Sequence, residues 1–230
     1  MAKLSASILS ADLAHLADQV RSVEPFVDVI HVDVMDGRFV PPLTFGPILV
    51  AALRRVTDRR LHGHLQVEAP GSLVDDLAAA GMDAVTFHVE AVEDPGPVIA
   101  KARGAGLRVG LTVSPETPVE GVFPHLDELD DVMVMSVHPG WAGQPFIPDS
   151  LAKVSAVRTE LERRGLRADV EIDGGISAGN ARRALDAGAN VLVAASAIFQ
   201  ATDIGAAARG LARIVRGEAP NDEQSDRGGD

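Results

Sequence analysis

Short runs of hydrophobic, often β-branched residues alternate with longer helical patterns along most of the chain. Eight runs have the length and composition of strands. They cover Leu4–Leu9, Val27–Val34, Leu61–Val67, Ala84–His88, Arg108–Val113, Asp131–Val137, Asp169–Asp173 and Val191–Ala194. Helical patterns lie between them, among them Leu13–Val23, Leu73–Ala80, Pro97–Ala105, Leu151–Arg164 and Ala178–Ala187. The strand runs are largely hydrophobic on both faces, which is typical of a sheet covered by helices.

Glycines and a proline mark the expected ends of these helices. Gly81, Gly106, Gly165 and Gly188 directly follow helical runs, where glycine takes the left-handed conformation that closes the last turn. Pro97 suits a first helical position, because its missing N–H would have no partner there.

The alternation of strands and helices favours parallel strands joined by right-handed crossovers. Eight such units in about 220 residues fit a (β/α)8 TIM barrel, so we expect an α/β protein with a single domain over residues 1–216. A doubly wound open sheet is the alternative, but no Gly-x-Gly-x-x-Gly turn follows the first strand. Residues 217–230 lack apolar periodicity, and we expect an acidic, disordered tail there.

Charge and composition narrow the classes of partner. The net charge of −12 argues against nucleic acid or an anionic membrane, since both favour a basic surface. A small phosphorylated substrate stays open, because backbone amides and helix N-termini bind phosphate without lysine. The chain has no cysteine, no apolar run of membrane-spanning length and no signal pattern at its start. These features predict a cytoplasmic protein.

Ligand-type side chains stand near the ends of three expected strands. His31 and Asp33 share one strand face because side chains alternate along a strand, while His64 and Asp173 stand near the ends of two others. Strand ends meet at the C-terminal face of a barrel. Two imidazoles and two carboxylates suit one divalent ion such as zinc, iron, manganese or cobalt. A single buried histidine is more often a structural residue, but four such residues together favour a metal site.

The same residues suggest proton chemistry. Asp33 and Asp173 come from the second and seventh strands, so they can face each other across a substrate as an acid/base pair. Simple metal ligation without proton transfer is the competing interpretation. His62 and His88 lie near the same rim and are interpreted as spare residues or as outer hydrogen-bonding partners.

Three loops after the last strands suggest a phosphate site. Loops after strands seven and eight of a barrel often bind phosphate, and glycine-rich or small-residue segments follow strands six, seven and eight here. These segments contain Gly140, Trp141, Ala142 and Gly143, then Gly174 and Gly175, then Ala195 and Ser196. Glycines can also serve only to make turns, but three loops at one end of the barrel favour an anion site.

The motifs resemble those of the ribulose-phosphate 3-epimerase family up to about Arg216. The matching segments are Ser-Ile-Leu-Ser-Ala-Asp-Leu (7–13), His-Val-Asp-Val-Met-Asp-Gly-Arg-Phe-Val-Pro (31–41), Leu-Thr-Phe-Gly-Pro (43–47), His-Leu (64–65), Met-Ser-Val-His-Pro-Gly (135–140), Gly-Gln-Pro-Phe-Ile-Pro (143–148), Asp-Gly-Gly (173–175) and Ser-Ala-Ile-Phe (196–199). The order and spacing of these segments are highly specific.

The resemblance implies a metal-dependent barrel isomerase that interconverts D-ribulose 5-phosphate and D-xylulose 5-phosphate through a cis-enediolate, with one divalent metal ion per subunit. It implies a homo-oligomer. By matching position, His31, Asp33, His64 and Asp173 would bind the metal, and Asp33 and Asp173 would be the catalytic pair. The substrate-binding residues would be Ser7, His64, Gly140, Trp141, Ala142, Gly143, Gly174, Gly175, Ala195 and Ser196.

The sequence departs from the family at four places. Gln66 stands where methionine is usual, Trp141-Ala142 replaces Phe-Gly, Ala195 replaces glycine, and Ala6 replaces proline. None of these four changes removes a candidate metal-ligand residue, but together they leave allulose-6-phosphate 3-epimerase as an alternative activity. A phosphosugar lyase or decarboxylase is a less favoured class, because none of the three lysines is expected at the barrel mouth: Lys3 precedes the first strand, and Lys101 and Lys153 fall in helical runs. A non-catalytic phosphosugar-binding barrel would be favoured if one of the four metal-ligand residues were missing, and all four are present.

Overall fold

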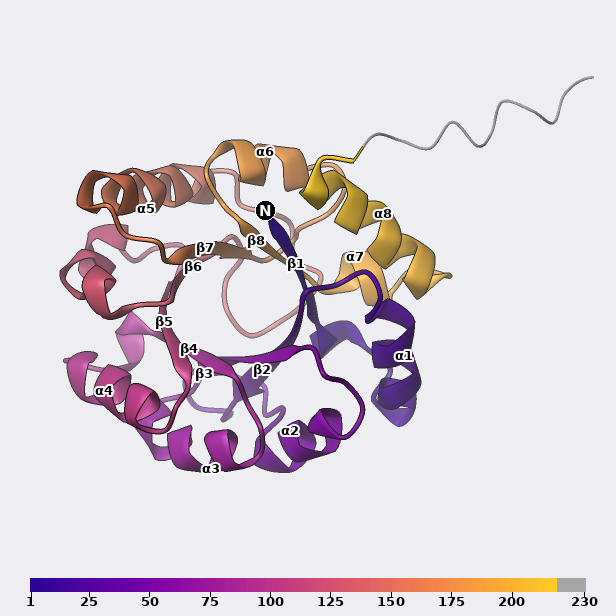
Figure 1. The fold of residues 1–230 in the computed structure, drawn as a ribbon, viewed down its shortest axis with the longest axis horizontal. Coiled ribbons are helices and arrows are strands. Elements are labelled where there is room, and N and C mark those ends of the chain that lie inside the picture. Colours follow the sequence, from indigo (N-terminus) through magenta and orange to yellow (C-terminus); the bar gives the residue numbers. More distant parts are fainter. Residues whose placement is uncertain (219–230) are drawn as a thin grey trace, which may run out of the picture.

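Eight parallel strands close into a ring at the centre of the computed structural model, which describes residues 1–218 (Figure 1). The strands are β1 (Lys3–Ser7), β2 (Val29–Met35), β3 (Arg60–Gln66), β4 (Ala84–His88), β5 (Arg108–Val113), β6 (Asp131–Met135), β7 (Asp169–Asp173) and β8 (Val191–Ala194). Each strand pairs with the next in sequence, and β8 pairs with β1. This confirms the (β/α)8 barrel and excludes the open sheet.

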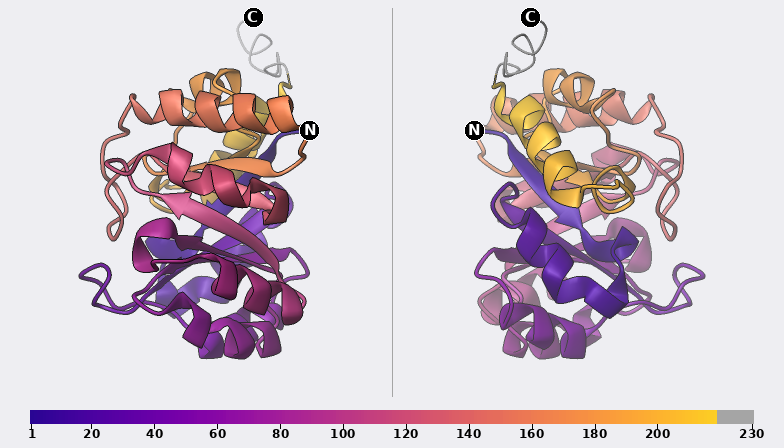
Figure 2. Two further views of the ribbon diagram at one scale, coloured as in Figure 1. Left: turned by 90° about the vertical axis from the view of Figure 1, so that its left-hand side faces the viewer. Right: turned by 90° about the vertical axis from the view of Figure 1, so that its right-hand side faces the viewer.

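Helices surround the ring and cover the outer faces of the strands, as the two side views in Figure 2 show. The α-helices are α1 (Leu16–Val23), α2 (Pro47–Arg54), α3 (Val74–Ala79), α4 (Gly96–Gly104), α5 (Ser150–Arg164), α6 (Ala181–Asp186), α7 (Ser196–Phe199) and α8 (Ile204–Arg216). Shorter 3₁₀ segments are η1 (Ile8–Ser10), η2 (Leu13–His15), η3 (Pro70–Ser72), η4 (Val89–Ala91) and η5 (Val119–Glu128). Between β5 and β6, η5 takes the place of an α-helix.

Several predicted boundaries were wrong by two or three residues. The first strand ends at Ser7 instead of Leu9, because the Ser7 Oγ accepts a hydrogen bond from the Leu9 N–H and starts η1. The first helix begins with a 3₁₀ turn, where Asp12 caps η2, and becomes α-helical only at Leu16. The predicted glycine helix stops are confirmed, since Gly81, Gly106, Gly165 and Gly188 all have positive φ.

The main hydrophobic core lies between the strands and the helices. Outward-facing strand residues such as Leu4, Ile30 and Phe87 are fully buried there. The inside of the ring is unusual, because barrels commonly fill it with bulky branched residues. Here many inward positions are polar and buried, including Ser5, His31, His62, Thr86, Thr112 and Glu171. A polar interior therefore extends below the strand ends that carry the candidate site.

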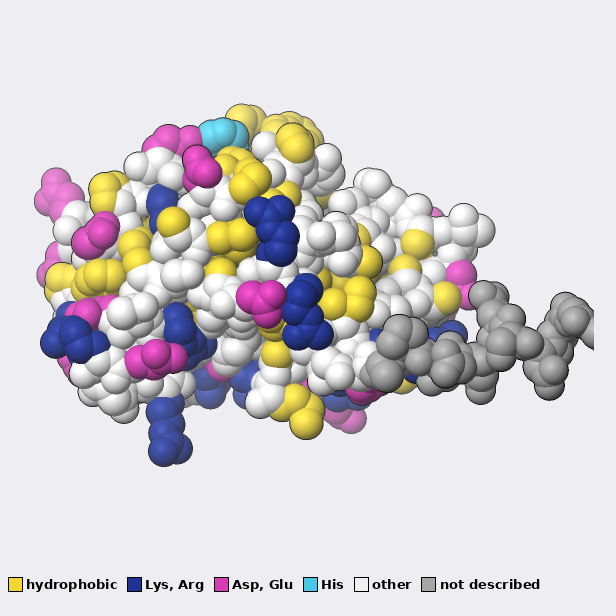
Figure 3. Space-filling view, turned by 90° about the horizontal axis from the view of Figure 1, so that it is seen from above, with side chains coloured by type: hydrophobic (Ala, Val, Ile, Leu, Met, Phe, Trp, Pro, Cys, Tyr) yellow, Lys and Arg dark blue, Asp and Glu magenta, His cyan; other side chains and the backbone are white. Residues whose placement is uncertain are grey.

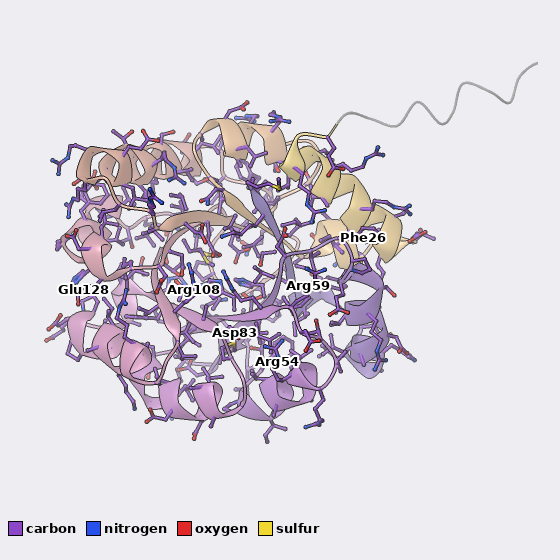
Figure 4. The ribbon with its side chains drawn as sticks, in the orientation of Figure 1. Phe26, Arg54, Arg59, Asp83, Arg108 and Glu128 are labelled. Carbon is purple, nitrogen blue, oxygen red and sulfur yellow. The ribbon has the colours of Figure 1, made fainter. Side chains whose placement is uncertain are left out.

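Charged side chains close the N-terminal end of the ring. Lys3 Nζ lies 2.6 Å from Asp169 Oδ2, and Arg108, inside the ring in Figure 4, lies 3.7 Å from the same oxygen. Deeper in, His62 Nδ1 lies 3.3 Å from Glu171 Oε1 and His62 Nε2 lies 3.8 Å from Asp131 Oδ1. These groups occupy the end of the barrel opposite to the glycine-rich loops.

Burial and neighbouring charges together set the ionisation of this lower cluster. It raises the pKa of the Asp131 carboxyl to about 7. It opposes charge on His62 as well, but Glu171 and Asp131 outweigh it and raise the pKa of that imidazole. Gly110 makes room for Asp131, since a Cβ at Gly110 would lie 1.9 Å from Asp131 Oδ1.

The outer surface mixes charges of both signs with scattered hydrophobic side chains on the face shown in Figure 3. Some of these charges connect helices to strands. Arg54 of α2, labelled in Figure 4, donates to Asp83 Oδ2 at 2.8 Å ahead of β4. Within residues 1–218, no helix is long and apolar enough to cross a membrane. The chain is helical up to Arg216, followed by the left-handed cap Gly217, and the predicted tail lies outside the described residues from position 219 onward.

Candidate active site

An open pocket of about 490 Å³ lies at the C-terminal ends of the strands. Its walls include every residue proposed for substrate contact except His64, which is fully buried beneath it. The floor adds hydrophobic side chains that sequence analysis did not assign to substrate contact, namely Leu9, Met35, Met135, Val137, Ile176 and Val193.

Four predicted ligand atoms face one another at the floor of this pocket. His31 Nε2 lies 3.5 Å from Asp33 Oδ1 and 3.7 Å from Asp173 Oδ2. His64 Nδ1 lies 3.3 Å and 3.5 Å from the same two oxygens. The ligand atoms of all four residues lie within 4.8 Å of one another. The fold therefore brings together the four residues that the sequence predicts as ligands.

The spacing fits one divalent ion. Ligands about 2.1 Å from a tetrahedral ion lie about 3.4 Å apart, which is close to the distances between these nitrogens and oxygens. Both ring nitrogens of the buried His31 lack a hydrogen-bond partner. Buried polar atoms without partners are rare in proteins, and a cation between the carboxylates would give His31 Nε2 a ligand role.

Without a bound cation, the electrostatics of the cluster favour an ionised Asp33 carboxylate and a protonated His64 imidazole. Burial on its own would raise the pKa of Asp33, but His31 and His64 outweigh it and hold that pKa well below its usual range. Burial likewise opposes charge on His64, yet hydrogen bonds to Asp173 and Asp33 raise its pKa to about 9. Asp33 thus keeps its negative charge at neutral pH.

His64 is connected to a second buried histidine behind it. His64 Nε2 lies 3.0 Å from His88 Nε2, and His88 Nδ1 lies 3.2 Å from Glu90 Oε2. Burial lowers the pKa of His88 to about 4, so its neutral ring can accept a hydrogen bond at Nε2 from the His64 Nε2–H and donate one from Nδ1–H to Glu90. This chain leaves His64 Nδ1 facing the two aspartates, and it makes His88 an outer partner of the cluster.

Two further side chains hold Asp33 in place. Ser7 Oγ donates to Asp33 Oδ2 at 2.6 Å, and Gln66 Nε2 donates to Asp33 Oδ1 at 3.0 Å. Such donors stabilise the ionised carboxylate and fix its orientation. Ser7 was expected to contact substrate, and the structure adds this link to a candidate catalytic group.

The loop after β7 requires its two glycines. Gly174 has φ +120°, and a Cβ there would lie 2.5 Å from a Val137 methyl group. Gly175 has φ +62°, and a Cβ there would lie 2.8 Å from the Phe146 backbone nitrogen. Ser136 Oγ bridges to the Asp173 and Gly174 carbonyls at 2.9 and 2.7 Å. The loops after β6 and β7 are therefore packed tightly together beside the pocket.

The other two predicted loops complete this wall. Ala195 has φ −111°, so the alanine in place of glycine is accommodated without strain, and Ser196 begins α7. In the loop after β6, Gln144 Nε2 donates to the His138 and Trp141 carbonyls. Trp141 itself is exposed at the pocket edge.

Together, the closed barrel, the buried His/Asp cluster and the glycine loops define a barrel protein whose candidate active site is at the C-terminal strand ends. The model of the ribulose-phosphate 3-epimerase family matches residues 3–199. Ribulose-phosphate 3-epimerase of Mycobacterium bovis is 44% identical over 210 residues, which cover 91% of each chain. The same enzyme of Synechocystis is 41% identical over 215 residues, covering 92% of this chain and 94% of its own.

The chain therefore belongs to the ribulose-phosphate 3-epimerase family, and it is an epimerase of the isomerase class. Solved structures with lower identity share the fold. The crystal structure of 3-hexulose-6-phosphate synthase from Salmonella typhimurium has a TM-score of 0.73 at 22% identity, over 94% of this chain and all of that one. That likeness supports the barrel architecture and nothing more specific.

Proposed function

We propose that this epimerase interconverts D-ribulose 5-phosphate and D-xylulose 5-phosphate by moving a proton at C3. The observation that carries the proposal is the cluster of His31, His64, Asp33 and Asp173 at the floor of a pocket walled by glycine loops. Relatives named ribulose-phosphate 3-epimerase support a ribulose phosphate as the substrate and C3 as the reacting carbon.

His31, Asp33, His64 and Asp173 would hold one divalent ion, and their donor set and spacing support this assignment. When bound, the ion would act as a Lewis acid toward the C2 carbonyl and C3 hydroxyl of the ketose. Zinc, iron, manganese and cobalt all accept this combination of imidazole and carboxylate ligands.

Asp33 and Asp173 would exchange the proton at C3. They belong to β2 and β7, and substrate between them would present one face to each carboxylate. One aspartate removes the C3 proton to leave a cis-enediolate, and the other, in its protonated form, delivers a proton to the opposite face. The direction of the reaction decides which aspartate acts as the base.

The loops of Gly140–Gly143, Gly174–Gly175 and Ala195–Ser196 would bind the phosphate through backbone amides. All three line the pocket and follow the neighbouring strands β6, β7 and β8, and positive φ at Gly143, Gly174 and Gly175 turns the chain sharply there. Binding energy from the phosphate would position C3 between the aspartates.

A substrate comparison tests the proposal directly. We expect kcat/KM for D-ribulose 5-phosphate to exceed that for D-allulose 6-phosphate by at least about 100-fold, because an extra hydroxymethylene must fit between the cluster and the phosphate loops. A coupled assay for each product measures both values. Faster turnover of the hexulose phosphate would instead establish the alternative activity, and no turnover of either sugar would favour a binding protein.

Replacing His88 with phenylalanine tests the outer hydrogen-bond chain. The change keeps a flat ring but removes the acceptor for the His64 Nε2–H, so we expect metal affinity to fall about 10- to 100-fold. Competition with a chromophoric chelator measures this affinity without an activity assay. Phenylalanine at the exposed His15 is the control, and equal metal affinity in both variants would contradict the role of His88.

We expect the protein to assemble into an oligomer of identical chains and to be located in the cytoplasm. A homo-oligomer in the cytoplasm is what the resemblance and the sequence imply, and size-exclusion chromatography with light scattering measures the subunit number. A mass equal to one 24.1 kDa chain would contradict the oligomer.

A further inference from the structure

Gln66 places an unpaired hydrogen-bond acceptor at the substrate pocket. Its side chain lines the pocket and is 1% exposed. The Nε2 group is used, since it donates to Asp33 Oδ1 at 3.0 Å. The Oε1 atom is buried and has no partner. A buried carbonyl without a donor is destabilising, so this oxygen needs explanation.

The orientation of the amide follows from its neighbour. Gln66 Nε2 lies 3.0 Å from Asp33 Oδ1 and 3.3 Å from His64 Nδ1, and an amide NH₂ group donates hydrogen bonds, whereas a carboxylate oxygen accepts them. A flipped amide would place Oε1 against the carboxylate oxygen and leave NH₂ without that acceptor. The fixed NH₂ end therefore leaves Oε1 as the free end of the side chain.

Strand register places Gln66 above the His/Asp cluster. Asp33 pairs with His64, and two residues further along Met35 pairs with Gln66. Because inward side chains alternate, Met35 and Gln66 form the next layer toward the pocket mouth. Met35 carries no strong donor. Among the described residues no group donates to Gln66 Oε1, and a hydroxyl group bound in the pocket beside Gln66 would supply that donor.

The opposite wall indicates which part of a ligand reaches Gln66. The proposed phosphate loops follow β6, β7 and β8, whereas Gln66 ends β3, on the other side of the ring (Figure 1). In a ketose phosphate whose C2 and C3 lie over the cluster, the phosphate end would extend toward β6–β8. The C1 hydroxymethyl group would then extend toward β3.

We propose that Gln66 Oε1 accepts a hydrogen bond from the C1 hydroxyl of the ketose phosphate. Gln66 would thus have two functions: its NH₂ group orients Asp33, and its carbonyl recognises the end of the substrate remote from phosphate. The inference rests on the proposed function, since it needs a ketose whose carbonyl lies at C2.

A substrate that lacks only this hydroxyl tests the contact. Wild-type protein and the variants Gln66→Met and Gln66→Leu are assayed with D-xylulose 5-phosphate and with 1-deoxy-D-xylulose 5-phosphate. The wild type is expected to favour the hydroxylated sugar in kcat/KM by about tenfold or more, which is the effect of one hydrogen bond to a substrate hydroxyl. In both variants the preference should fall to about twofold.

The ratio separates this contact from the support of Asp33. If Gln66 acted only by holding Asp33, each variant would slow both sugars equally, and an unchanged ratio would overturn the inference. Equal use of the two sugars by the wild type would overturn it as well, even without the variants. Failure of the wild type to epimerise either sugar would overturn the proposed function and this inference together.

Discussion

The Asp173→Asn variant is expected to fold normally and to lose interconversion of the two pentulose phosphates by about 10²- to 10⁴-fold in kcat. Asparagine keeps the shape of the side chain but cannot take or deliver a proton at neutral pH, and general acid–base catalysis contributes an effect of this order. The C3 proton of the epimer that faces Asp173 should stop exchanging with solvent. Proton NMR in D₂O measures the exchange of each epimer directly.

Asp169→Asn is a matched control on the same strand. Asp169 begins β7 at the opposite end of the barrel, where it pairs with Lys3. That variant should keep normal turnover per folded molecule, with only some loss of stability. Normal exchange of both epimers in Asp173→Asn would contradict the two-carboxylate scheme, while circular dichroism shows that the variant is folded.

Removal of divalent metal is expected to abolish turnover, with a loss of at least about 10³-fold that returns when manganese, cobalt, zinc or iron is added. The ion contributes several kcal/mol to charge stabilisation in such reactions, and about 4 kcal/mol corresponds to this loss. Dialysis against a chelator, followed by elemental analysis, establishes that the protein is free of metal before it is assayed.

Metal binding should also raise thermal stability, because a ligand that binds only the folded state stabilises it in proportion to the logarithm of its concentration over Kd. The His31→Gln variant, which loses one of the four ligand residues, should show a smaller rise in Tm on metal addition than the wild type. Full activity in protein shown to be metal-free would rule out the role of the ion, whatever the effect on Tm.

The sequence predicted much of the barrel because its signals are local. β-Branched runs and glycine stops depend on nearby residues, and four of the eight strands have the predicted bounds, as β4, β5, β7 and β8 show. Errors occurred where a side chain redirects the backbone. The Ser7 hydroxyl ends β1 early, and Asp12 caps a 3₁₀ turn ahead of α1. Capping of this kind competes with the regular pattern over only two or three residues.

The sequence by itself determined the prediction of which residues form the candidate site. His31 and Asp33 had to share a face because strand side chains alternate, and strand ends of a barrel meet at one rim, which brings in His64 and Asp173. The family motifs then assigned their roles. The sequence pattern marks His88 and Gln66 but identifies a partner for neither, and it indicates no role for Asp131 or Glu171.

Only the tertiary structure decided how these groups meet. The register between β2, β3 and β4 sets three features of the site. These are the ring nitrogen that each histidine turns to the aspartates, the link from His64 through His88 to Glu90, and the free carbonyl of Gln66. The cluster of His62, Asp131 and Glu171 depends on closure of the ring, which joins β3 to strands more than 60 residues away. Alternation fixes the face on which a side chain lies, but distances between side chains are set by register and closure, which no local pattern encodes.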